Sequence, residues 1–229
     1  MALRKKITWL ILFSIAMGFM ETVIVVYLRK LYYPDGFAFP LVTMDMDILK
    51  AEIFREAATV IMLLAIGVLS GKTASQKFAY FIFCFAIWDI FYYVFLKLLL
   101  DWPESLFTWD ILFLIPVPWV GPVIAPCIVS LTMIVLTGCI VYLGEKGFAT
   151  KIKAFEWFLF TAGSLIVILS FSLDTVKFIS ISPGQTTIPA VPSDYNWWLF
   201  WAGELIIILG IVIYLRKIKH ENKLLITSR

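Results

Sequence analysis

Apolar stretches long enough to cross a bilayer recur six times along this chain. The chain has 229 residues, of which 62% are hydrophobic and 15% charged. A soluble domain carries about 25% charged residues, and a membrane helix needs about 20 consecutive apolar residues. We therefore predict an all-α, polytopic integral membrane bundle that forms a single transmembrane domain over residues 1–229. The six predicted spans are residues 7–28, 48–70, 78–100, 119–143, 154–172 and 197–215.

The basic residues predict how the bundle is oriented, because loops rich in Lys and Arg stay in the cytoplasm. With the N-terminus inside, 13 of the 19 Lys and Arg fall on the inner side, and both termini are cytoplasmic. The acids show the reverse distribution, with 13 of 16 in the membrane or toward the outer side. We expect the plasma (inner) membrane. The inner basic residues are Arg4, Lys5, Lys6, Lys72, Lys77, Lys146, Lys151, Lys153, Arg216, Lys217, Lys219, Lys223 and Arg229.

Four prolines crowd the first half of the stretch from Asp110 to Leu143, at positions 116, 118, 122 and 126. Proline lacks a backbone donor and clashes with the preceding helical turn. We predict a proline-broken or interfacial segment at residues 105–118, which would form a pocket wall because non-helical backbone at membrane depth must be buried or line a cavity. A simple helix lying on the membrane surface is the alternative.

Carboxylates inside predicted spans are the strongest functional signal. An ionised side chain at the centre of a membrane helix costs about 2.5–3.5 kcal/mol on insertion scales, so such groups pair, face a cavity or take part in function. The rise of about 1.5 Å per residue places Glu21, Glu56 and Glu204 in one layer below the outer surface, with Asp89 nearer the middle. We predict a substrate- or ion-binding site formed by Glu21, Arg55, Glu56, Asp89 and Glu204.

These five side chains would carry a net charge of −3 if all were ionised. Either some acids are protonated, or a bound cation compensates. We expect Arg55 to contact Glu21, Glu56 or Glu204, because a guanidinium cannot lose its proton at that depth. An ion network that only fixes helix packing is the structural alternative.

Other acids have structural interpretations. Asp110 could serve as the N-cap of a helix that starts at Ile111, and Asp45 or Asp47 could begin the second span. Glu52 could simply reach the lipid headgroups.

No sequence motif identifies a reaction. The only histidine, His220, lies in the basic tail, and Cys84, Cys127 and Cys139 all fall inside predicted spans. The sequence names no cofactor, and we expect no nucleic-acid partner. The first hypothesis is a transporter or membrane-embedded solute-binding subunit, with an outward-leaning carboxylate pocket for a cation, an amine solute or a proton. The alternatives are an intramembrane enzyme acting on a lipid or isoprenoid, with a carboxyl group as general acid or base, and an accessory subunit of a larger membrane-protein complex.

Overall fold

Six long helices make up almost all of the computed structural model, which describes every residue except 1, 182–193 and 228–229. All six are long and apolar enough to cross a membrane. The predicted number of helices is therefore confirmed for the described part of the chain. The elements, in chain order, are α1 (Leu3–Tyr32), α2 (Met46–Ser70), α3 (Ala74–Leu100), β1 (Trp109–Phe113), β2 (Trp119–Pro122), α4 (Ile124–Glu145), α5 (Ala154–Ile181) and α6 (Trp197–Thr227).

Short polar side chains set two of the helix starts. The Asp45 carboxylate accepts hydrogen bonds from the backbone N–H groups of Asp47 (2.9 Å) and Ile48 (3.4 Å), so Asp45 is the N-cap of α2. The Thr73 hydroxyl likewise accepts from the Gln76 N–H at 3.2 Å and caps α3. Each cap satisfies backbone donors that the first turn of a helix leaves free.

The proline-rich approach to α4 forms a β-hairpin. β1 and β2 pair antiparallel, with Asp110 opposite Gly121 and Ile111 opposite Val120. The surface-helix alternative is wrong, and α4 begins at Ile124 rather than at residue 119. Prolines at 116 and 118 occupy the turn between the strands, where a missing N–H costs no ladder hydrogen bond. Pro126 is tolerated because it lies in the first turn of α4.

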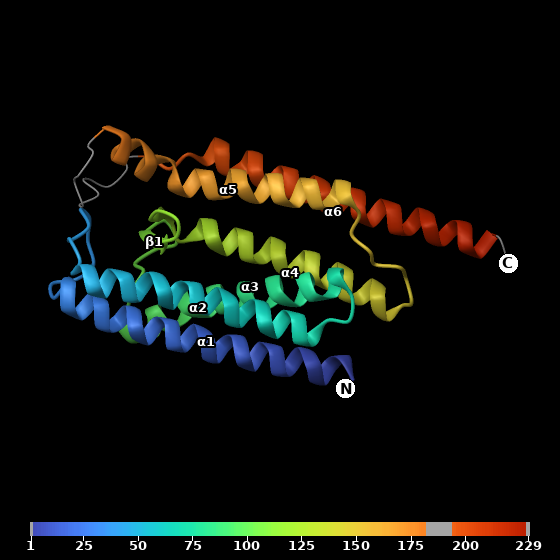
Figure 1. Cartoon of the computed structure of the whole chain (residues 1–229), viewed down its shortest axis with the longest axis horizontal. Helices are drawn as coiled ribbons and strands as arrows, with labels where there is room; N and C mark the ends of the chain where they lie inside the picture. Colours follow the sequence, from blue (N-terminus) through green and yellow to red (C-terminus); the bar gives the residue numbers. More distant parts are fainter. Residues whose placement is uncertain (1, 182–193, 228–229) are drawn as a thin grey trace.

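The helices form two groups (Figure 1). α3 packs against α1, α2 and α4, whereas α5 and α6 pack chiefly against each other. The α5–α6 pair meets the rest of the described chain chiefly through contacts of α6 with α4 and of α5 with β2, and the Trp157 ring of α5 packs edge-on against Phe78 of α3. α5 extends to Ile181, nine residues beyond the predicted end of the fifth span at residue 172.

Glycine allows α5 and α6 to approach closely. A Cβ atom added at Gly203 would lie 2.8 Å from the carbonyl oxygen of Gly163, and one added at Gly163 would lie 2.8 Å from the carbonyl oxygen of Gly203. Small residues at helix contacts permit this kind of packing in membranes, where apolar burial alone gives little driving force.

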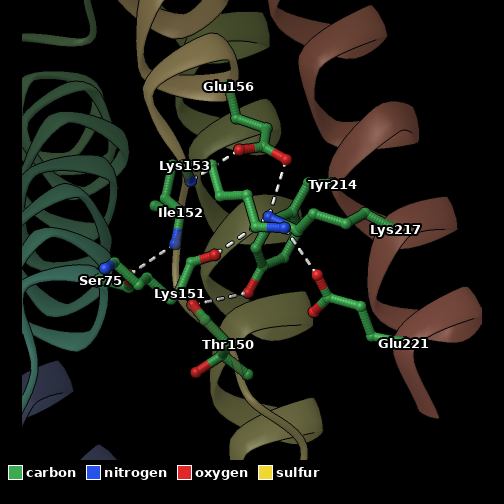
Figure 2. A network of polar contacts seen from close by, with 9 residues as sticks. All are labelled: Ser75, Thr150, Lys151, Ile152, Lys153, Glu156, Tyr214, Lys217 and Glu221. Carbon is green, nitrogen blue, oxygen red and sulfur yellow. Dashed lines mark hydrogen bonds and ion pairs between the residues drawn. The ribbon is translucent and has the colours of Figure 1, made fainter. Parts of the chain in front are cut away.

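The loop between α4 and α5 is tied to α6 by a polar network (Figure 2). The buried Glu156 carboxylate accepts from Lys217 at 2.7 Å and from the Lys153 N–H at 2.6 Å. Lys153 also pairs with Glu221 at 2.7 Å. From α3, the Ser75 hydroxyl accepts from the Ile152 N–H at 2.9 Å. The network lies at the same end of the bundle as the N-terminus and the α2–α3 turn (Figure 1).

Candidate functional site

A cavity of about 230 Å³ lies among α1, α2, α3, the connection from α1 to α2, and the β-hairpin. Four of the five predicted site residues line it, and Glu204 does not. The hairpin contributes non-helical backbone to the cavity wall. The charged lining residues are Glu21, Arg29, Glu52, Arg55, Glu56, Asp89 and Asp110.

Arg55 joins α1 to α2 on one side of the cavity. Its Nε donates to Glu52 Oε2 at 2.8 Å, and its Nη1 donates to Glu21 Oε2. The prediction that Arg55 contacts one of the neighbouring acids is therefore confirmed. Glu52 is buried and belongs to this network, so the interpretation that it reaches the lipid headgroups is wrong. One guanidinium faces two carboxylates.

Glu56 and Asp89 receive hydrogen bonds only from uncharged donors. Glu56 Oε2 accepts from the backbone N–H of Leu114, at the end of β1, at 2.9 Å. Asp89 Oδ2 accepts from the Ser130 hydroxyl of α4 at 2.8 Å. Within the described residues, neither carboxylate forms an ion pair. Both are thus cavity carboxylates that accept hydrogen bonds from neutral groups.

Arg29 and Asp110 form a second ion pair, which sequence reasoning missed. Arg29 Nη2 donates to Asp110 Oδ1 at 2.9 Å, and both side chains are buried. The Arg29 guanidinium lies 3.7 Å from the ring centroid of Trp102 and 4.4 Å from that of Phe37. Aromatic faces at such distances stabilise a cation. The ion pair fastens the hairpin to the end of α1.

Asp110 lies within strand β1, so the interpretation of Asp110 as a helix N-cap is wrong. Burial raises the pKa of its carboxyl group to about 6, against the lowering effects of Arg29, the Ile111 N–H and Tyr93. Arg29 gave no sequence signal, because it stands beside Lys30 at the predicted end of the first span. Asp110 lies 81 residues further along the chain, so no local pattern links the two residues.

Glu204 lies on the far side of α4 from the cavity. Its side chain is fully buried between helices, and its Oε2 accepts from the Thr132 hydroxyl of α4 at 2.9 Å. The predicted common layer placed Glu204 beside Glu21 and Glu56 by depth alone. The structure separates them, because the described part of α6 packs chiefly on α5 and α4.

The cavity combines excess negative charge with an aromatic wall. Its five carboxylates and two arginines would carry a net charge of −3 if all were ionised. Trp88, Tyr92 and Tyr93 of α3 also line it. Aromatic faces attract cations. In the part of the chain that the structure describes, no three His, Cys, Asp or Glu side chains converge to hold a metal ion.

Comparisons with protein-family models, with curated proteins and with solved structures found no match to this chain.

Proposed function

We propose that this chain is a multi-pass membrane transporter, or a membrane-embedded solute-binding subunit, whose cavity takes a small cationic ligand. The ligand class comprises a cation, an amine-bearing solute or a proton. One observation carries the proposal: two arginines face five carboxylates in a single cavity, and Glu56 and Asp89 form no ion pair among the described residues.

Burial of an ionised carboxylate without a partner is expensive, and the cost falls when a cation or a proton arrives. Arg55 is shared by Glu21 and Glu52, and Arg29 is paired with Asp110. A positively charged ligand would therefore find its strongest attraction at Glu56 and Asp89, and α3 would supply the aromatic contacts.

The proposed orientation places both termini in the cytoplasm of a plasma (inner) membrane. The N-terminus, the α2–α3 turn and the α4–α5 loop lie at one end of the bundle (Figure 1), and basic residues gather in these segments. This grouping supports the orientation, because basic loops stay in the cytoplasm. Residues of the α1–α2 connection line the cavity, including Phe37 and Met44. In this orientation the cavity leans outward, and the hairpin lies toward the outer interface.

An enzyme acting on an anionic lipid headgroup receives less support. Such an enzyme needs cationic side chains that can hold the headgroup. Here both arginines of the cavity already pair with carboxylates.

Ligand-induced stabilisation of the purified protein tests the proposal. Small primary and quaternary amines and monovalent cations are screened by thermal unfolding in detergent, with an anionic lipid as the competing ligand. A ligand at one hundred times its Kd stabilises the native state by about 2.7 kcal/mol. We expect stabilisation by a cationic ligand in the wild type and in Glu104→Gln, an exposed acid outside the cavity, and its loss in Glu56→Gln and Asp89→Asn. Stabilisation by the anionic lipid alone, retained in both cavity variants, would favour the enzyme and contradict the proposal.

A further inference from the structure

Glu204 is a membrane-buried carboxyl group that the proposed cation site does not use. Its side chain has no exposed surface, whereas the next residue on α6, Leu205, is exposed. Oε2 accepts from the Thr132 hydroxyl at 2.9 Å, whereas Oε1 is buried and has no hydrogen-bond partner among the described residues. One oxygen is therefore satisfied and the other is not.

No cation compensates Glu204 within the described part of the chain. The charged residues of the two helices packed against α6 lie near their ends: Glu145 on α4, and Glu156, Asp174 and Lys177 on α5.

The nearest lysines along these helices are too distant to pair with Glu204. On α5, Val167 lies against Gly203, the neighbour of Glu204. A rise of about 1.5 Å per residue places Lys177 about 15 Å along the helix from Val167. The same rise places Arg216 about 18 Å and Lys217 about 20 Å along α6 from Glu204. Lys217 is in addition paired with Glu156.

This environment favours a neutral acid over an anion. A buried carboxylate that keeps one uncharged donor has lost most of its solvation and has gained no opposite charge. A buried neutral carboxylic acid loses only the hydrogen bonds of a polar group, which costs far less. The unpartnered oxygen is then the natural position for the proton.

We propose that Glu204 is a proton-binding site of its own, separate from the cavity. Oε1 carries the proton and Oε2 accepts the hydrogen bond of Thr132, so that a neutral carboxylic acid joins α6 to α4. This site does not depend on the proposed cation ligand, because Glu204 does not line the cavity and its hydrogen bond joins it to Thr132 of α4.

Infrared spectroscopy of the whole protein in lipid tests the assignment. The C=O stretch of a protonated carboxylic acid is separate from the carboxylate and amide bands, and it moves to higher frequency when the oxygen loses a hydrogen bond. At neutral pH we expect Glu204→Gln to remove one carboxylic acid band. We expect Thr132→Val to shift the same band upward. The control Glu104→Gln, at an exposed acid, should remove a carboxylate band instead.

Two results would overturn the proposal. One is the loss of a carboxylate band, rather than an acid band, in Glu204→Gln. The other is a set of acid bands that Thr132→Val leaves unmoved. If Glu204→Gln does not fold, the comparison of Thr132→Val with the wild type still tests the proposal. Val has nearly the shape of Thr and leaves the Glu204 carboxyl group in place. This experiment does not measure ligand binding, so a negative result for Glu204 would not contradict the proposed cation site in the cavity.

Discussion

Replacement of Arg55 by methionine isolates the energetic role of the α1–α2 ion network. Methionine keeps a long side chain but removes the guanidinium that Glu21 and Glu52 share. The Arg55 side chain is only 18% exposed, that of Glu21 is 11% exposed and that of Glu52 is 9% exposed. Solvent therefore screens the network weakly. Arg55→Met therefore leaves two buried carboxylates without a cation.

The expected cost follows from buried ion pairs in general. Removal of one partner of such a pair destabilises a protein by about 3–5 kcal/mol. We expect the lower end, about 3 kcal/mol, because an orphaned carboxyl group can take up a proton. Reversible unfolding in mixed micelles with a rising fraction of denaturing detergent measures the difference in the free energy of unfolding. Arg4→Met, at an exposed position near the N-terminus, is the matched control and should cost almost nothing.

A compensating variant tests whether unpaired charge causes the loss of stability in Arg55→Met. The triple variant Arg55→Met, Glu21→Gln, Glu52→Gln removes all three charges and should recover most of the loss, because neutral amides are far cheaper to bury than anions. If Arg55→Met were as stable as Arg4→Met, the network would not hold α1 against α2. If the triple variant were no more stable than Arg55→Met, charge imbalance would not be the cause.

Three further predictions test packing, pH dependence and topology. Gly203→Ala should cost about 1–3 kcal/mol in unfolding experiments, because overpacking strains a close helix contact. Its Cβ would lie 2.8 Å from a carbonyl oxygen of α5, whereas Gly138→Ala has open space and should not destabilise; equal effects would contradict the close packing. The Asp110 pKa rises from 3.8 to about 6 on folding, so the native state binds the proton more tightly than the unfolded state. Stability should therefore fall as pH rises from about 4 to 6 and level off above about pH 6. Asp110→Asn should abolish this slope, and a slope that persists in the variant would count against the burial of Asp110. In a cysteine-free background on intact cells, an impermeant maleimide should label Asp35→Cys and not Ala74→Cys, both exposed in the structure; the reverse pattern would overturn the orientation.

Local patterns predicted the parts of this structure that depend on one segment at a time. Apolar length alone predicted all six helices, and the cost of an unpaired guanidinium predicted the contact of Arg55 with an acid. The depth of a residue along its helix, however, does not determine which way its side chain points or which helix packs against it. Glu204 was therefore placed at the level of Glu21, while the packing of α6 against α4 takes it to a different interface.

Long-range pairings account for the residues that the sequence did not reveal. Asp110 had an adequate local interpretation as a helix cap, and Arg29 gave no sequence signal. Only the hairpin, which replaces the predicted start of the fourth helix, brings them to 2.9 Å. The prolines predicted a break in the helix, but proline excludes a conformation without selecting what replaces it.

The hairpin connects the candidate site to the α5–α6 pair. On the β1 side, Asp110 holds Arg29, and the Leu114 N–H donates to Glu56. On the β2 side, the Pro118 carbonyl accepts from Thr175 of α5 at 2.8 Å, and Gly121 lies against the ring of Phe171. Since one short element contacts both the cavity carboxylates and α5, a change in the charge of Glu56 acts on backbone that α5 also holds.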